Sequence, residues 1–431
     1  MRLFQNSRVT GDIVVMPNPP PAAEESPVIV AWQTNDPKGA EVRVVTGADN
    51  EQLVSRGGQT GEVELNWVRG ATEYDFRLYG LSRPRTLLDS VRIKRRVGSW
   101  KSVFRELTKQ VAHGQIDVTD AADFIAKAIP QYLQPAQYRH LFPEWERCGF
   151  HVTPVHFYEP IPEVGALPES TWSKASELCG IDMNESSQLR LLREEFPKFR
   201  DEYEQLPTAP TSEPGRFYLN NGLFDGTDAL VAYCMLRHLQ PRLVLEVGSG
   251  FSSLLTGETV RRGNKTELIC IEPFPRDFLR QGFPGLRSLI ESKVQDVDLA
   301  VFAQLECGDV LFIDSSHTVK IGGDVNYLFL EVLPRLKPGV IVHVHDILFP
   351  FDYRRDWVKE QFRFWNEQYL LQAFLCFNSA FEVLLSASYL GYYYLNELKA
   401  TFPTSPWWND PRTEIPPGGT SFWMRRRLGP A

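Results

Sequence analysis

The chain has 431 residues, a hydrophobic content of 43% and a formal net charge of −8, from 46 basic and 54 acidic residues. This length exceeds one typical domain, so we expect two or three, and the composition is that of a folded protein rather than a disordered one. The acidic balance, without a long basic run, argues against nucleic acid and anionic membranes as partners.

The cysteines and the first residues bear on the cellular compartment. Six cysteines are scattered along the chain without a CxxC pair, and several lie inside apolar segments. This usage is typical of reduced core thiols. The first eight residues lack the apolar core of a signal peptide, and no segment approaches the length of a membrane span. We therefore expect a cytoplasmic protein.

Residues 1–97 have the sequence pattern of an all-β domain. Apolar and polar residues alternate in four segments separated by turns, at 28–33, 41–45, 63–67 and 74–79. A period of two is typical of strands buried on one face. Residues 72–78 resemble the penultimate strand of fibronectin type III domains, and Trp32 resembles their core tryptophan. The resemblance implies a β-sandwich that acts as a binding or spacing module, without catalytic residues.

Residues 98–215 have a mostly helical pattern and are interpreted as a connecting or cap region. Apolar residues recur at helical spacing in 187–196, and Pro and Gly mark 207–215 as a linker. His151 and His156 lie in an aromatic-rich stretch between the helical segments. We interpret both as packing or surface residues.

Residues 216–431 alternate strands and helices, as in a parallel, doubly wound, Rossmann-like sheet. Strands are expected at 243–247, 268–271, 310–313 and 340–344. The first is a nearly continuous apolar run, as a strand buried on both faces requires. The chain is thus predicted to be multidomain, with an all-β sandwich, a helical middle region and an α/β domain.

A glycine turn, Gly248–Ser249–Gly250, follows the first of these strands. The glycines permit a tight turn and leave room for a ligand against the backbone. Glu246 precedes the turn, and Glu272 ends the next strand, where its carboxylate can accept hydrogen bonds from ribose hydroxyls. The arrangement predicts a site for a nucleoside-type cofactor.

The details of the turn favour S-adenosylmethionine (SAM). The dinucleotide motif GxGxxG has a third glycine where this chain has Ser253. SAM has no phosphate, and its sulfonium and ribose suit an acid-flanked turn. Residues 217–427 resemble the class I SAM-dependent methyltransferases. The resemblance implies an antiparallel edge strand at 421–425 and the following cofactor-binding residues: Glu246, Gly248, Ser249, Gly250, Ser252, Ser253, Glu272 and Asp296.

Polar residues follow the third and fourth strands of this domain. Asp314 and His317 come after the third, and His345 and Asp346 after the fourth. Because the carboxyl ends of neighbouring parallel strands meet at one edge, both pairs are expected beside the cofactor. An alcohol is a poor nucleophile at neutral pH, so a carboxylate-bound metal can polarise it while a histidine takes its proton.

This pattern resembles the metal-dependent sugar O-methyltransferases of macrolide biosynthesis, the macrocin and mycinamicin type. The resemblance implies that Asp314 and Asp346 bind a divalent metal and that His317, beside Asp314, is the catalytic base. His345, a third predicted ligand, stands where those enzymes have glutamate, so Mg²⁺, Mn²⁺ and a softer ion stay open. In metal-free methyltransferases the acid after the third strand only shapes the acceptor pocket. His343 is interpreted as a packing or outer residue.

The leading hypothesis is therefore an O-methyltransferase that acts on a hydroxyl of a sugar, glycan or glycosylated small molecule. One alternative is a non-haem iron hydroxylase of the cephalosporin hydroxylase-like group, with His317, His345 and an aspartate as iron ligands. Another is a non-catalytic SAM-binding protein. The sequence is compatible with a homo-oligomer. Aromatic residues are dense at 362–371 and 389–394, and we interpret them as core or dimer interface rather than as a sugar-binding wall.

Overall fold

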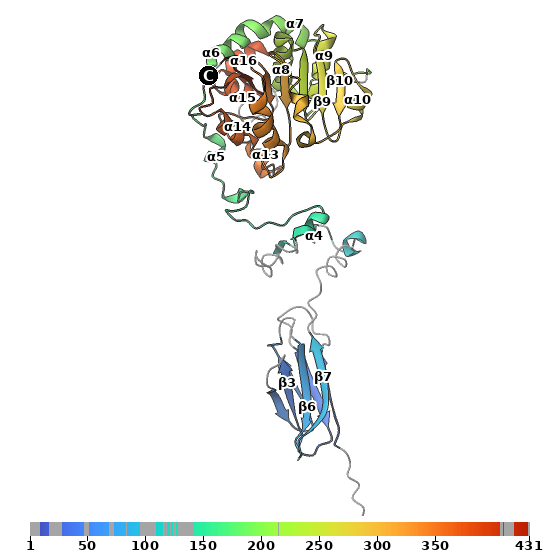
Figure 1. Ribbon diagram of the computed structural model, residues 1–431. Helices are drawn as coiled ribbons and strands as arrows, with labels where there is room; N and C mark the ends of the chain where they lie inside the picture. The colour runs from blue at the N-terminus through green and yellow to red at the C-terminus, as the bar shows by residue number, and fades with distance from the viewer. Residues whose placement is uncertain are drawn as a thin grey trace, which may run out of the picture. The chain divides into compact units, whose positions relative to one another are not determined.

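The computed structural model describes residues 9–16, 28–46, 51–68, 73–82, 84–94, 109–114, 117, 119–120, 122–123, 126–127, 142–213, 215–405, 408 and 418–429. The chain divides into two compact units, Met1–Val152 and Thr153–Ala431 (Figure 1). The division at 97 and 215 into three parts stays a prediction, and the first of these boundaries lies outside the described residues.

The first unit contains two antiparallel sheets. One has three strands in the order β1-β2-β5, and the other has four in the order β4-β3-β6-β7. Their bounds are β1 Gly11–Met16, β2 Val28–Thr34, β3 Ala40–Thr46, β4 Gln52–Gly57, β5 Thr60–Leu65, β6 Glu73–Gly80 and β7 Thr86–Lys94. The helix α4, Phe142–Arg147, also belongs to this unit. Here His151 is exposed and its ring stacks on Phe142, with the centroids 4.4 Å apart.

Alternation along the strands builds one core between the two sheets. In β6 the inward residues Tyr74, Phe76 and Leu78 are buried, while the residues between them are more exposed. They join one apolar cluster with Trp32 of the other sheet. A Cβ on Gly61 would lie 2.2 Å from the Trp32 ring, so the glycine leaves room for the indole. The prediction of an all-β region is confirmed for the described residues.

The second unit contains a seven-stranded sheet in the order β10-β9-β8-β11-β12-β14-β13. Its strands are β8 Leu243–Val247, β9 Glu267–Ile271, β10 Leu286–Ile290, β11 Val310–Ile313, β12 Ile341–Val344, β13 Phe381–Ser386 and β14 Phe422–Arg426. The four strands expected from the sequence are confirmed to within one residue. The predicted edge position of the last strand is wrong, because β14 runs antiparallel between β12 and β13.

Helices cover this sheet (Figure 1). The α-helices are α5 Ser170–Ser173, α6 Glu185–Arg190, α7 Arg200–Tyr203, α8 Gly226–Leu239, α9 Phe251–Arg261, α10 Asp277–Gln281, α11 Leu299–Phe302, α12 Asp324–Tyr327, α13 Arg355–Lys359, α14 Glu367–Leu375, α15 Ala387–Tyr393 and α16 Leu395–Thr401. Shorter or irregular turns are η2 Val164–Ala166, η3 Leu191–Glu195, η4 Phe196–Phe199, η5 Val294–Asp296, η6 Leu328–Val332 and η7 Leu333–Arg335. None of the described helices is long and apolar enough to cross a bilayer.

The buried strands contribute side chains to a core on each face of the sheet. Leu245 of β8 joins a cluster that includes Phe329 of η6, whereas the adjacent Val244 joins a second cluster with Leu230 of α8. Burial on both faces explains why these strands are continuous apolar runs.

The segment before the sheet belongs to the same core. Leu192, Phe196 and Tyr203 are each 0% exposed and join the cluster that contains Val244. The hydroxyl of Tyr203 donates to the carbonyl oxygen of Thr401 at 2.5 Å. Residues 185–206, predicted as part of a connecting region, thus pack as an integral part of the second unit.

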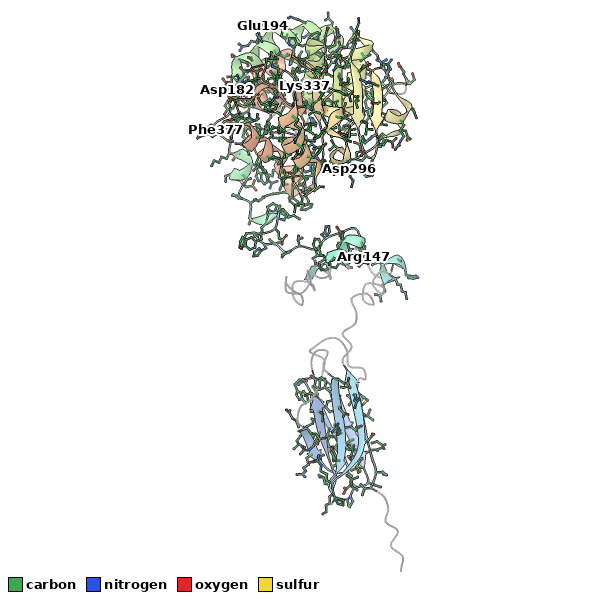
Figure 2. All side chains as sticks on the ribbon, viewed as in Figure 1. Arg147, Asp182, Glu194, Asp296, Lys337 and Phe377 are labelled. Atoms are coloured by element: carbon green, nitrogen blue, oxygen red, sulfur yellow. The ribbon has the colours of Figure 1, made fainter. Side chains whose placement is uncertain are left out.

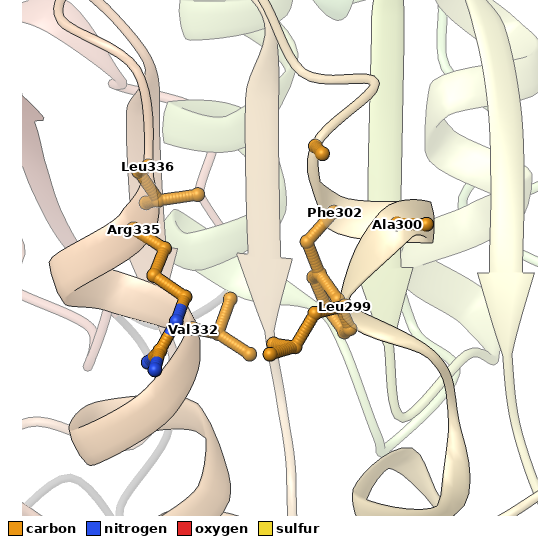
Figure 3. A pocket seen from close by; sticks show the side chains of 7 residues that line it. Leu299, Ala300, Phe302, Val332, Arg335 and Leu336 are labelled. Carbon is orange, nitrogen blue, oxygen red and sulfur yellow. The ribbon is translucent and has the colours of Figure 1, made fainter.

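A shallow groove of about 200 Å³ lies between α11 and the η6–η7 turns. Its apolar walls include Leu299, Phe302 and Val332, and Arg335 lies at one side (Figure 3). None of the predicted site residues lines it.

Candidate active site

The topology brings three loops together at one edge of the sheet. Strand β11 pairs with β8 on one side and with β12 on the other, in parallel. The glycine turn after β8, the loop from Asp314 and the loop from His345 therefore leave neighbouring strands at the same edge.

His317 lies among three carboxylates. Its Nε2 is 3.2 Å from Oδ1 of Asp314 and 3.4 Å from Oδ2 of Asp346. Its Nδ1 is 2.9 Å from Oε2 of Glu367, the first residue of α14. His317 is 6% exposed and Glu367 is 0% exposed. The imidazole is thus held at both ring nitrogens inside a largely water-excluded cluster.

The backbone around this cluster is unusual. His317 and Asp346 have φ angles of 56° and 57°, in the left-handed region that residues other than glycine rarely adopt. The carbonyl oxygen of His317 accepts hydrogen bonds from the amides of Asn366 at 3.0 Å and Glu367 at 3.1 Å. These bonds hold the strained loop in place, and such strain is typical of functional sites.

Electrostatics favour a charged imidazole at this position. Burial lowers the pKa of His317, but the hydrogen bonds to Asp314 and Glu367 and the charge of Asp346 outweigh it and raise the pKa well above the usual 6.5. Burial raises the pKa of Asp314, and the nearby His345 and His317 outweigh this and lower it.

The same cluster fits a divalent metal ion. One ligand atom each from Asp314, His317 and Asp346 lie within 4.8 Å of one another. Two carboxylates and an imidazole are donors that suit Mg²⁺, Mn²⁺ or Fe²⁺. The donor set therefore matches the predicted metal at Asp314 and Asp346.

The predicted ligand His345 lies to one side of this group. Its Nε2 is 3.9 Å from Oδ1 of Asp346, its Nδ1 has no hydrogen-bond partner, and its ring packs 5.0 Å from that of Phe224. The group that the structure gathers thus contains His317 in place of His345. It has one histidine, so the geometry gives no support to a site with two histidines and one carboxylate.

His343 is a packing residue. It is 0% exposed, and its ring lies 3.9 Å from that of Phe312 and 4.7 Å from that of Trp423. Burial lowers its pKa well below the usual 6.5. This agrees with its interpretation from the sequence.

Several residues around the cluster were not identified from the sequence. Glu367 orients His317, and the hydroxyl of Thr420 lies 3.1 Å from Oδ1 of Asp346. The buried Asp228 accepts hydrogen bonds from the amides of Thr420 and Ser421 and so holds the segment that carries this hydroxyl. Glu367 and Thr420 are 50 and 74 positions from their partners. No local sequence motif predicts either residue.

The two glycines of the turn have different roles. Gly248 has a φ of 79°, and a Cβ there would lie 1.6 Å from the carbonyl oxygen of Asp314. This glycine therefore permits the close approach of two loops. A Cβ on Gly250 would have no atom within 4 Å. The open space against the backbone, predicted for a cofactor, is found at Gly250.

Five of the predicted cofactor residues are joined by hydrogen bonds in and beneath the turn. Oε1 of Glu246 accepts hydrogen bonds from the hydroxyls of Ser252 at 2.5 Å and Ser253 at 2.9 Å, and Ser253 accepts one from the amide of Gly250. Glu246 and Ser253 are each 0% exposed. The hydroxyl of Ser249 also turns inward, 3.2 Å from the carbonyl oxygen of Glu246. This network stabilises the turn from below.

The other predicted cofactor residues lie farther out along the sheet. Glu272 follows β9 directly, and its Oε1 accepts a hydrogen bond from the amide of Phe274 at 2.8 Å. Asp296 ends η5 and is exposed at the rim of the second unit (Figure 2). Both carboxylates are open to solvent at least in part. Their roles toward a cofactor stay predictions.

Comparison with known proteins places a methyltransferase domain in this region. Residues 245–347 match the sequence model of a family described as a methyltransferase domain. That range contains the glycine turn and the whole of the Asp314, His317 and Asp346 cluster. An uncharacterised protein of Archaeoglobus fulgidus is 38% identical over 162 residues, which are 36% of this chain and 73% of the relative.

Solved structures give weaker likenesses. One is the O-methyltransferase TomG from Streptomyces achromogenes in complex with SAM, at 14% identity and a TM-score of 0.27, covering 59% of this chain and 92% of that one. Another is an O-methyltransferase from Bacillus cereus in complex with SAH, at 12% identity and a TM-score of 0.24, covering 56% of this chain and 90% of that one.

Proposed function

Because this chain belongs to the family of the Archaeoglobus fulgidus protein and carries a methyltransferase domain at residues 245–347, we propose that it is a SAM-dependent O-methyltransferase. The acceptor is a hydroxyl of a sugar, glycan or glycosylated small molecule, and a divalent metal assists the transfer. The β-sheets of the first unit serve as a fibronectin type III-like binding or spacing module.

The observation that carries this proposal is the cluster of Asp314, His317 and Asp346 beside the turn at Gly250. These donor atoms lie within 4.8 Å of one another. Gly250, which has open space against its backbone, follows the neighbouring strand β8 at the same edge of the sheet. A base, a metal-binding pair of carboxylates and room for a cofactor are the parts that methylation of an alcohol needs.

Each residue has a defined task in this mechanism. Asp314 and Asp346 would hold the metal, which lowers the pKa of a bound hydroxyl and makes it a better nucleophile. His317 acts as the base and not as a ligand: a cation held by Asp314 and Asp346 would offset their negative charge and favour the neutral imidazole, whose Nε2 then takes the proton of the acceptor hydroxyl. Glu367 binds Nδ1 at 2.9 Å and keeps Nε2 directed at the cluster. Thr420, at 3.1 Å, fixes the carboxylate of Asp346.

Calorimetry and turnover assays on metal-loaded protein test the proposal. A chelator should abolish methyl transfer and leave SAM affinity largely unchanged. Asp346→Asn should lose the metal, measured by elemental analysis, whereas His317→Gln should keep it and slow turnover by about 10²–10⁴-fold, the usual contribution of a positioned base. Asp277→Asn is the matched control, because its side chain is 91% exposed.

Two results would contradict the proposal. A wild-type protein that binds NAD and not SAM would overturn the cofactor. Full activity in excess chelator, together with a wild-type rate for Asp346→Asn, would leave a metal-free methyltransferase in which Asp314 and His317 act as an acid–base pair.

A further inference from the structure

An aromatic wall stands beside His317, and it includes Trp365 from the stretch 362–371 that was expected to form core or a dimer interface. The ring centroid of Trp365 is 4.4 Å from that of His317, with the planes tilted by 45°. The ring of Trp357 meets Trp365 edge-on at 5.2 Å. Trp357 and Trp365 are both only partly buried. The wall therefore lies next to the atoms that would receive the acceptor proton.

A guanidinium group lies against this wall. The Cζ of Arg363 is 5.0 Å from the Trp365 centroid and 5.6 Å from the Trp357 centroid. Among the described residues no carboxylate pairs with Arg363. In the same segment Arg354 pairs with Asp356 and Arg355 with Glu169. Arg363 is exposed and thus offers its hydrogen-bond donors to a ligand.

The loop that carries Arg363 is tied to the candidate active site. The amide of Arg363 donates to the carbonyl oxygen of Trp357 at 2.8 Å, and the amide of Asn366 donates to that of His317 at 3.0 Å. The Cζ of Arg363 lies 5.0 Å from the ring centroid of Trp365, and that centroid lies 4.4 Å from the ring centroid of His317. One sugar residue with its substituents is long enough to reach from Arg363 to His317.

We propose that Trp365 and Arg363 form the acceptor subsite and that the acceptor is an anionic sugar. This inference rests on the proposed function above. The sugar ring packs against the solvent-exposed part of Trp365, and its carboxylate or phosphate pairs with Arg363. Since no described carboxylate pairs with Arg363, its guanidinium supplies the positive charge that an acidic acceptor needs.

Matched acceptors test this subsite with the full-length chain. Methyl glycosides of glucose, galactose and mannose are compared with the uronates and the 6-phosphates of the same sugars, with labelled SAM as methyl donor. We expect the anionic member of a series to be methylated with a kcat/KM at least about 10-fold above that of its neutral counterpart, as one charged hydrogen bond provides. The uronate and phosphate arms identify the anionic group.

Variants assign the preference to Arg363. Arg363→Gln should abolish it mainly through KM, and Arg363→Lys should restore it in part. Arg355→Gln, which removes a neighbouring arginine already paired with Glu169, should leave it unchanged.

Equal rates for neutral and anionic acceptors would overturn the subsite, as would a preference that survives in Arg363→Gln. In both cases methyl transfer continues, so the proposed function stands. An array in which no sugar is methylated also overturns the anionic-sugar acceptor, and SAM calorimetry then tells whether the proposed function fails with it.

Discussion

Glu246 is a fully buried carboxyl group beneath the glycine turn. Burial raises its pKa from the usual 4.5 to about 8. The folded state therefore binds more protons than the unfolded state between these values, and stability falls as the pH rises through this window. In Glu246→Gln the free energy of unfolding should depend less on pH. Relative to the wild type, the variant should therefore become more stable by about a few kcal/mol between pH 5 and pH 9.

Urea unfolding at both pH values measures the effect. Glu267→Gln is the control, because its side chain is 53% exposed on the neighbouring strand. A variant whose stability follows the same pH slope as the wild type would mean that Glu246 is ionised in the folded protein.

Gly248 and Gly250 should respond differently to the same substitution. Gly248→Ala would place a Cβ 1.6 Å from the carbonyl oxygen of Asp314, on a residue whose φ is 79°. This substitution should destabilise the fold by about 2 kcal/mol or more. Gly250→Ala has open space and should keep stability while lowering SAM affinity. Thermal unfolding and calorimetry separate the two outcomes, and an unchanged SAM affinity in a folded Gly250→Ala would place the cofactor elsewhere.

The sequence predicted the residues of the candidate active site that are close along the chain. Asp314 and His317 follow one strand and Asp346 the next, so parallel topology alone brings them together. The position of Glu367 depends on how α14 packs against the loop after β11, 50 positions away. The direction of side chains could not be predicted either, because the sequence does not show that Ser252 and Ser253 turn inward to Glu246 rather than outward.

At the scale of elements, the position of β14 gives a further prediction. Because β14 pairs with both β12 and β13, its removal would leave two strand edges unpaired within the sheet and would take Trp423, which is 0% exposed, out of the core. Ending the chain after residue 417 should prevent folding. Ending it after residue 427, beyond the strand, should not.

Soluble yield and circular dichroism distinguish these two truncations. An edge strand, as the sequence predicted, would be lost at a smaller cost to the sheet. A folded, cooperatively melting protein that ends at residue 417 would therefore favour the edge position over the one described here.

Strands were predicted where burial marks them in the sequence. The parallel strands β8 and β11 are buried throughout and appear as apolar runs. In the first unit β1, β4 and β7 were missed. None of the β4 residues is fully buried and that strand has no clear alternation, whereas β1 does alternate over its six residues. The central place of β14 results from pairing with strands distant in sequence, which periodicity does not report.

At the scale of the whole molecule, the two compact units set the last prediction. The second unit begins at Thr153, whereas the sequence placed the start of the catalytic domain at residue 216. Residues 185–206 supply Leu192, Phe196 and Tyr203, all 0% exposed, to the core beneath β8.

A fragment of residues 153–431 should therefore fold and bind SAM, while one of residues 216–431 should not. Loss of each large buried side chain costs about 2–5 kcal/mol, and three together reach the whole stability of a typical domain. Urea unfolding and SAM calorimetry on both fragments measure this. If the shorter fragment unfolds cooperatively and binds SAM as tightly as the full chain, the boundary lies at 215 and residues 185–206 only cover a core that is complete without them.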